Sequence, residues 1–378
     1  MPHPEELKRL NAEIASHLGH LGKCCIYVLS MYVLGMVIVR HCGQTQIAAL
    51  LSQLMGCEFG TMKQRLRELT YEASAKSGEK RHEVDVKSCF APLLRWVLSK
   101  FRVEHKQVVL ALDATYLVDR FIILAVSVVV SGSAIPVAWH IEEANQKGEW
   151  NPIWKALLDR LAPAIPTDWS VFVLTDSGLY SKTLYVHLTQ ELKWQALMRI
   201  EGSQGVFKPK GRRRWSPIRH SMHRNMQPLI MSGTCFIAHP IDCTLVIQWE
   251  TPYDTPCVLV TNLAPEQVNL NVYGIRYWIE CSFKDIKRGL FHWEQTKMTC
   301  PQRAERLWLV ITIALLWLSA LGDAAATLPR WHSLHRARPT CPILSAPILG
   351  WIDLILALLH HHPIPYGHFN PYPWLTDP

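Results

Sequence analysis

A change of hydrophobic period near residue 107 restricts the fold of this chain more than any other feature of its sequence. Three β-rich runs follow it, QVVLALDATY, RFIILAVSVVVSG and SAIPVAWHIEE, with turn residues between them. Two segments of helical pattern, WNPIWKALLDRLAPAI and SKTLYVHLTQEL, then alternate with the strand-like segments WSVFVLT and KWQALMRI. The expected order is β-β-β-α-β-α-β, which predicts an α/β domain.

The residues ahead of these strands, up to about 105, have the pattern of helices. Among them, QTQIAALLSQLMGCEFGTMKQRLREL contains one apolar helical pattern, a break with glycine, and a second pattern that carries Lys63, Arg65 and Arg67. This arrangement is typical of a DNA-binding helix-turn-helix, and it also fits an ordinary helical hairpin.

Positive charge is concentrated in one stretch of the chain. The formal net charge is +8, and residues 202–241 contain no Asp or Glu. This stretch opens with KPKGRRR and continues into the strand-like runs PLIMSGTCFIAHP, CTLVIQWE and CVLVTNL. We therefore expect a small all-β insertion whose basic loop contacts DNA, with a merely solvated loop as the alternative.

Cysteine usage and apolar runs bear on where the protein resides. The eleven cysteines include no C-x-x-C pair, which argues against a zinc site or a disulfide framework and favours a reducing cytosol. The apolar runs Cys24–Val39, Leu307–Leu321 and Ala346–Leu359 are shorter than the roughly 18–20 residues that span a membrane. We interpret them as buried core helices, with a membrane protein as the alternative. The N-terminus, MPHPEELKRL, lacks the hydrophobic segment of a signal peptide.

Two aspartates occupy unusual settings. Asp113 interrupts the apolar strand LALDATY, where a charge is costly unless it is paired or binds a cation. Asp176 follows the strand VFVLT, at the end where α/β sheets place ligand-binding groups. A structural turn or cap explains one such residue more easily than it explains both.

The segment YGIRYWIECSFKDIK contains a third acid, Glu280. Projected as one continuous helix at about 100° per residue, it has a polar and an apolar side. The polar side combines Glu280 with Tyr273, Arg276, Lys284 and Lys287. The apolar side consists of Ile279, Phe283, Ile286 and Leu290. An ordinary surface helix explains a Glu–Lys pair four residues apart, but not the additional Arg and Lys.

Three carboxylates that converge repel one another and need divalent cations. Ligation by oxygen alone suits magnesium or manganese. Two such ions about 3.5–4 Å apart can activate a water or hydroxyl and stabilise the leaving oxygen of a phosphodiester. Because basic groups hold a phosphate backbone, acids and a basic surround together indicate phosphoryl transfer on nucleic acid.

These residues carry a resemblance to a known family. The spacing Tyr273-(2)-Arg276-(3)-Glu280-(6)-Lys287 matches the Y-(2)-R-(3)-E-(6)-K signature of DDE transposases of bacterial insertion sequences in every residue type. Asp113 and Asp176 resemble that family's first and second catalytic aspartates. The resemblance covers about residues 107–322. It implies an α/β fold with a ribonuclease H-like mixed-sheet core and an all-β insertion domain, plus helical N-terminal and C-terminal regions.

The expected domain boundaries follow from the resemblance and the element pattern. They are a helical N-terminal DNA-binding region (1–105), a first part of the catalytic core (106–200), a β-rich insertion (201–264), a second part of the core (265–325) and a C-terminal region (326–378).

The resemblance also implies a reaction. Asp113, Asp176 and Glu280 would be catalytic and would bind two Mg²⁺ ions, with Mn²⁺ as an alternative. The chain would cut the ends of an element and join them to target DNA. The expected DNA-binding residues are Tyr273, Arg276, Lys284 and Lys287 near the cut, Lys208, Lys210, Arg212, Arg213 and Arg214 in the basic loop, and Trp249, which would stack on a flipped base unless it is simply a core tryptophan.

The expected partners are double-stranded DNA, both terminal inverted repeats and target, and a second copy of the chain in a homodimer on that DNA. We expect no membrane partner and a place on the nucleoid in the bacterial cytoplasm. Two alternatives stay open: a related metal-dependent nuclease that does not join strands, and an inactive transposase-derived DNA-binding protein.

Overall fold

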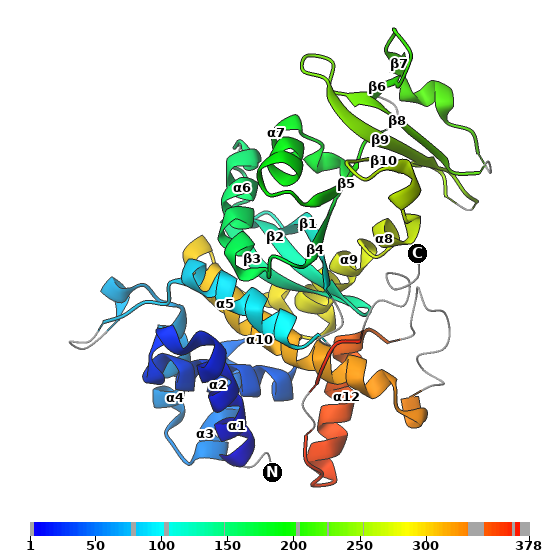
Figure 1. Ribbon diagram of the computed structural model, residues 1–378. Helices are drawn as coiled ribbons and strands as arrows, with labels where there is room; N and C mark the ends of the chain where they lie inside the picture. The colour runs from blue at the N-terminus through cyan, green and yellow to red at the C-terminus, as the bar shows by residue number, and fades with distance from the viewer. Residues whose placement is uncertain are drawn as a thin grey trace.

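The computed structural model describes residues 4–76, 81–101, 106–146, 148–201, 205–224, 227–251, 253–331, 344–364 and 367–370. The molecule is elongated. N-terminal helices occupy one end, the core sheet lies in the middle, and a β-rich lobe forms the opposite tip (Figure 1).

The core sheet contains the five strands that the sequence predicted. β1 (Gln107–Leu117), β2 (Phe121–Val130) and β3 (Ser133–Glu143) form an antiparallel meander. β4 (Ser170–Thr175) and β5 (Gln195–Arg199) then run parallel to β1, which gives the order β3-β2-β1-β4-β5. This is the ribonuclease H-like, mixed-sheet α/β core expected from the sequence. All ten residues of β2 are buried, so neither of its faces meets solvent.

The two helices of the β-α-β-α-β portion also form where the sequence placed them. α6 (Trp150–Leu161) follows β3 and buries Trp154, Leu157 and Leu158. α7 (Lys182–Val186) begins at Ser181, whose side chain accepts a hydrogen bond from the Leu184 amide and so caps the helix.

The β-rich insertion extends the core sheet. β10 (Cys257–Thr261) pairs antiparallel with β5, and β9 (Ile241–Gln248), β8 (Leu229–Cys235) and β6 (Val206–Pro209) follow outward to β7 (Ser216–Pro217). The result is one ten-stranded sheet. Its outer strands form the tip seen in Figure 1.

The N-terminal region is helical, as expected. It comprises α1 (Pro4–Leu18), α2 (Lys23–Val39), α3 (Gln44–Met55), α4 (Phe59–Thr70) and α5 (Val86–Ser99). α3 ends at Gly56, whose φ of 61° is the left-handed conformation that glycine adopts without strain.

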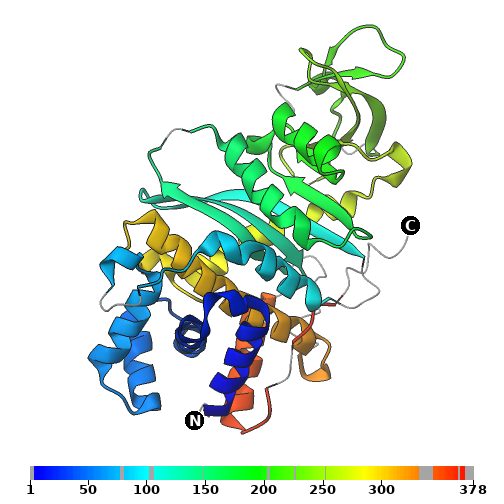
Figure 2. The same ribbon diagram turned by 60° about the vertical axis from the view of Figure 1, so that its left-hand side comes forward.

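α10 (Pro301–Ala326) is the central helix of the molecule. Figure 2 shows it between the sheet and the N-terminal helices, where it packs on β3, α2 and α4. It is long and apolar enough to cross a membrane, yet 89% of its most apolar window is buried inside the protein. That burial is expected of the core helix that we inferred for this run.

α12 (Ala346–Leu359) crosses α10 closely. A Cβ atom on Gly322 would lie 1.7 Å from the Ala346 carbonyl oxygen, and one on Gly350 would lie 1.9 Å from the Leu318 oxygen. The two glycines therefore permit the contact. Residues 332–343 and 371–378 of the expected C-terminal region lie outside the described residues, as does Cys341; the ten described cysteines are free thiols.

Candidate active site

Parallel pairing of β1 with β4 brings the two aspartates to one edge of the sheet. Leu112 stands opposite Thr175 in this register, so the residues that follow them, Asp113 and Asp176, are neighbours. Asp113 lies within β1, where its backbone pairs with Ala125 of β2. The Asp113 side chain is 15% exposed and that of Asp176 is 36% exposed.

Glu280 comes from an interrupted helix. The sequence predicted a continuous helix over Tyr273–Lys287, but α8 (Leu270–Gly274) ends before Arg276, α9 covers Tyr277–Lys284, and a π-turn covers Asp285–Gly289. Between α8 and α9 the amides of Arg276, Trp278 and Ile279 bond to carbonyls three residues back, which tightens the backbone there.

The apolar side predicted for this segment is confirmed. It consists of four buried side chains, Ile279, Phe283, Ile286 and Leu290. On the same element, the Ser282 hydroxyl oxygen accepts a hydrogen bond of 2.6 Å from the Ala134 amide at the start of β3. α9 is thereby fixed against the sheet, and the 46%-exposed Glu280 side chain faces the aspartates.

Arg276 contacts all three acids. Its Nη1 donates to Asp113 Oδ2 at 3.1 Å, and its Nη2 donates to Glu280 Oε1 at 2.7 Å. The same Nη2 lies 3.8 Å from Asp176 Oδ1. Because one nitrogen reaches both Asp176 and Glu280, their carboxylates lie close together. The Arg276 side chain is only 9% exposed, so these contacts are largely shielded from water.

An open pocket of about 460 Å³ surrounds this cluster. β1, the end of β4, α9 and the π-turn form its walls. The lining residues are Asp113, Ala114, Thr115, Asp176, Arg276, Glu280, Phe283, Lys284, Lys287 and Arg288. Six of the residues predicted from the sequence to form the site are thus brought together: Asp113, Asp176, Arg276, Glu280, Lys284 and Lys287.

The electrostatics of the pocket follow from burial. Burial raises the pKa of Asp113, although Arg276 and the Ala114 amide, which donates to Oδ1 at 2.9 Å, oppose that shift. Burial lowers the pKa of Lys287, with the neighbouring charge of Arg288 acting in the same direction. Lys287 Nζ donates to the Thr115 hydroxyl at 2.6 Å, which holds the ammonium group over β1.

Sequence reasoning missed three residues of this site. Thr115 could have been found, because residues two apart in a strand share a face with each other, here with Asp113. Arg199, at the end of β5, has its Nη1 3.8 Å from Asp176 Oδ1. Arg288 reaches the pocket from the π-turn. The last two positions depend on the strand order and the turn geometry, which no local pattern signals.

Tyr273 lies outside the lining of the pocket, next to the end of β4. Its hydroxyl donates to the Thr175 carbonyl at 3.1 Å, next to Asp176, and its side chain is buried. Burial raises its pKa. Tyr273 therefore supports the end of β4 rather than lining the open pocket.

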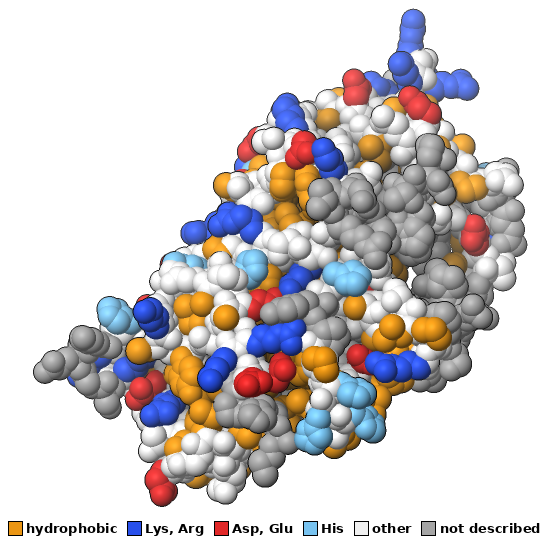
Figure 3. Space-filling view, turned by 60° about the horizontal axis from the view of Figure 1, so that its bottom comes forward, with side chains coloured by type: hydrophobic (Ala, Val, Ile, Leu, Met, Phe, Trp, Pro, Cys, Tyr) orange, Lys and Arg blue, Asp and Glu red, His pale blue; other side chains and the backbone are white. Residues whose placement is uncertain are grey.

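The other predicted DNA contacts lie in the insertion, away from the pocket. The exposed Arg212, Arg213 and Arg214 connect β6 to β7, and Figure 3 shows Lys and Arg side chains gathered at this tip of the molecule. Lys208 Nζ is 5.5 Å from the centre of the Trp215 ring, a cation–π distance.

Trp249, the predicted stacking residue, is half-buried just after β9. Its Nε1 donates to the Tyr253 carbonyl at 3.0 Å, and the Arg224 guanidinium lies 5.9 Å from its ring centre. It is therefore a surface tryptophan of the insertion and not a member of the main core cluster.

The side chains of this site are chemically suited to bind a divalent cation, but their positions are not those of a metal site. Three carboxylates are the hard oxygen ligands that Mg²⁺ and Mn²⁺ prefer. Yet no three His, Cys, Asp or Glu side chains in the described part of the chain are arranged to hold a metal ion. The positive charge among the acids is instead the Arg276 guanidinium.

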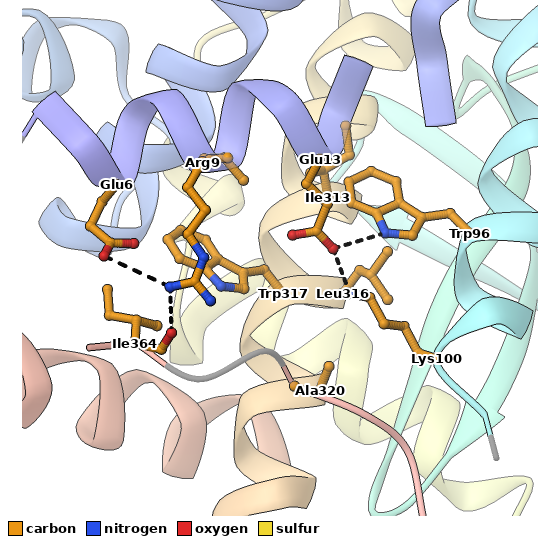
Figure 4. A pocket seen from close by; sticks show the side chains of 12 residues that line it. Glu6, Arg9, Glu13, Trp96, Lys100, Ile313, Leu316, Trp317, Ala320 and Ile364 are labelled. Carbon is orange, nitrogen blue, oxygen red and sulfur yellow. Dashed lines mark hydrogen bonds and ion pairs between the residues drawn. The ribbon is translucent and has the colours of Figure 1, made fainter. Parts of the chain in front are cut away.

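A second, smaller pocket lies between α1, α5, α10 and the chain near Ile364 and has a volume of only about 30 Å³ (Figure 4). Glu13 accepts hydrogen bonds from Trp96 Nε1 and Lys100 Nζ, and Arg9 donates to the Ile364 carbonyl. Such a volume holds about one water molecule. The hydrogen bonds around this space join α1 to α5 and to the C-terminal part of the chain, so we interpret it as a packing feature.

A family model described as the transposase DDE domain matches residues 120–317, which include Asp176 and Glu280 and begin after Asp113. Among solved structures, the chain is similar to a piggyBac transposase in a cryo-EM synaptic complex with hairpin DNA. That similarity has 12% sequence identity and a TM-score of 0.42, and it covers 90% of this chain and 72% of the other. No curated protein matches the chain.

Proposed function

The chain belongs to the family of DDE transposases, and from that premise we propose that it is the transposase of a bacterial insertion sequence, which cuts the ends of its element and joins them to target DNA. The observation that carries the proposal is the convergence of Asp113, Asp176 and Glu280, from three separate segments, on one guanidinium in an open basic pocket.

The acidic side chains of the pocket would bind metal ions, and the basic side chains would bind DNA phosphates. Asp113, Asp176 and Glu280 would hold two divalent cations, Mg²⁺ or Mn²⁺, which at such sites activate a water or hydroxyl and stabilise the leaving oxygen. DDE transposases generally use divalent metal ions, which the three carboxylates can bind by their chemistry. Lys284, Lys287 and Arg288 surround the acids with positive charge and would hold the DNA phosphates on either side of the cut.

Binding of a long DNA duplex would use surfaces beyond the pocket. The basic tip between β6 and β7 supports non-specific phosphate contacts. The exposed side chains of Lys63, Arg65 and Arg67 on α4, after the Gly56 turn, support the helix-turn-helix interpretation of the N-terminal region. The partly exposed Trp249 supports a stacking role for a flipped base.

Transposition requires two element ends to be handled together, so the proposed active form is a homodimer on DNA. The terminal inverted repeats and the target would both be double-stranded DNA. The proposed location is the nucleoid in the cytoplasm of a bacterium, where this substrate is found.

Purified full-length protein should cut a duplex that carries the inverted repeat flanking its gene, when Mg²⁺ or Mn²⁺ is supplied. It should also join a precut end to a plasmid. Glu280→Gln should lower both rates by roughly 10³-fold or more, the scale seen when a member of a catalytic unit is removed. The matched control is Glu143→Gln, at an exposed carboxylate at the end of β3.

The outcomes separate the proposal from its alternatives. Cleavage without joining would identify a nuclease of the same family. DNA binding without cleavage would identify an inactive descendant. Full activity of the Glu280→Gln protein would reject the assignment of the site.

A further inference from the structure

The arrangement of Arg276 raises a question about how cations enter the site. One guanidinium contacts carboxylate oxygens from β1, from the end of β4 and from α9 at distances between 2.7 and 3.8 Å. The proposed function assigns the same three carboxylates to metal binding. A guanidinium and a divalent cation bound to the same carboxylates repel each other at such short range, so the two compete.

The competition is unequal across the three acids. Asp113 is 15% exposed and bonds to Arg276 Nη1 at 3.1 Å, whereas Asp176 and Glu280 are 36% and 46% exposed. A cation arriving from the open side of the pocket therefore meets Asp176 and Glu280 first. To complete its shell with Asp113, the cation must displace the guanidinium.

We propose that Arg276 is an internal counterion that holds the three carboxylates together before the reaction. When a DNA phosphate binds the guanidinium, the carboxylates become available to divalent cations. This inference rests on the proposed function and adds a positioning role to Arg276. A guanidinium fits the paired oxygens of a phosphate as well as those of a carboxylate, so the DNA backbone offers an equivalent partner.

The exchange couples the two ligands. DNA that draws Arg276 away leaves the acids uncompensated and strengthens metal binding. By reciprocity, metal that occupies the acids releases Arg276 and strengthens DNA binding by the same factor. The site thus becomes fully loaded with cations only when substrate is present.

The test is the affinity of the full-length protein for Mn²⁺ alone, measured by calorimetry at constant pH without DNA. Arg276→Gln should bind Mn²⁺ at least about tenfold more tightly than the wild type, because it lacks a competing charge in contact with the ligands. Arg276→Lys should gain less, since a point charge still competes but cannot reach all three acids. The matched control is Arg160→Gln, which removes one positive charge at an exposed position on α6, outside the lining of the pocket. It should change the affinity less than threefold.

Two further measurements keep the result interpretable. Adding Asp113→Asn to Arg276→Gln should abolish the gain, which places the bound ion at these acids. In the wild type, a saturating non-cleavable duplex should tighten Mn²⁺ binding by a similar factor. This measurement tests the inference even if the variants do not fold.

Equal Mn²⁺ affinity of the wild type and Arg276→Gln, or no effect of the duplex, would overturn the inference while leaving the proposed function intact. Absence of Mn²⁺ binding in every variant, with and without DNA, would count against the metal chemistry of the proposed function itself.

Discussion

The contact between Lys287 and Thr115 shows how a single side chain can set the position of a group that we propose binds phosphate. Lys287 lies in the π-turn after α9, and its ammonium group is held 2.6 Å from a buried hydroxyl on β1. Two elements that are distant in the sequence are thereby joined at the pocket wall. The register of β1 places Thr115 beside Asp113, so acid and base stand at a fixed spacing.

Thr115→Val removes that acceptor while conserving shape. We expect kcat/KM for end cleavage to fall about tenfold, because hydrogen bonds to charged groups contribute about 1.5–3 kcal/mol. The loss should appear mainly in KM for DNA, and Thr115→Ser should restore it. Steady-state cleavage assays will measure the effect. A loss in kcat alone, or a Thr115→Ser variant as impaired as the valine, would contradict a role in positioning Lys287.

At the scale of elements, the π-turn after α9 begins at a buried carboxylate. The Asp285 carbonyl accepts from the Leu290 amide at 2.8 Å, and its carboxylate accepts from Ser345, the residue before α12, at 2.8 Å. Burial raises the pKa of Asp285 to about 6. Because this folded pKa exceeds the ordinary value of 3.8, its contribution to stability is fully present below about pH 4 and is lost as the pH rises through 6.

Asp285→Asn should therefore stabilise the fold at pH 8 by about 1–3 kcal/mol relative to the wild type, since each pKa unit corresponds to about 1.4 kcal/mol. The amide oxygen can still accept from Ser345. The advantage should shrink towards zero near pH 4, as measured by urea unfolding across the pH range. The exposed Asp254→Asn should show no such trend. A constant difference at all pH values would rule out ionisation of Asp285 as the cause.

The elements also show what the sequence could and could not reveal. The core order and the buried side of α9 were predictable, because alternation and helical spacing are local properties of the chain. The break at Arg276 and the π-turn were not, since a helical wheel assumes a constant 100° per residue. The burial of Asp285 was not predictable either, because its carboxylate bonds to Ser345, sixty residues away.

At the scale of the whole molecule, α10 connects the N-terminal helices to the catalytic core. Arg306, which is buried, donates to the carbonyls of Thr70 and Val84 and to the Glu83 carboxylate, each at 3.1 or 3.2 Å. One side chain thus anchors the end of α4 and the segment before α5. These contacts span more than 220 positions of sequence, and no local pattern predicted them.

Arg306→Met should keep the packing of the apolar stem and leave these acceptors without their partner. We expect a loss of about 2–4 kcal/mol in the free energy of unfolding. Hydrogen exchange should become faster in α4 before it changes in the core strands. The control is Arg95→Met, at an exposed position on α5. Uniform acceleration throughout the sheet would show that Arg306 supports the entire fold rather than the junction.

The unbroken ladder from β3 to the outermost strands has a mechanical consequence. β10 joins the insertion to β5 through paired backbones, and the last residue of β5, Arg199, stands 3.8 Å from Asp176. A force on the outer lobe, such as a bound duplex would exert in the proposed function, would act on these backbone hydrogen bonds between β5 and β10. Because the outer lobe and the core share one sheet, a displacement of the lobe would be transmitted through β5 and Arg199 to the carboxylates.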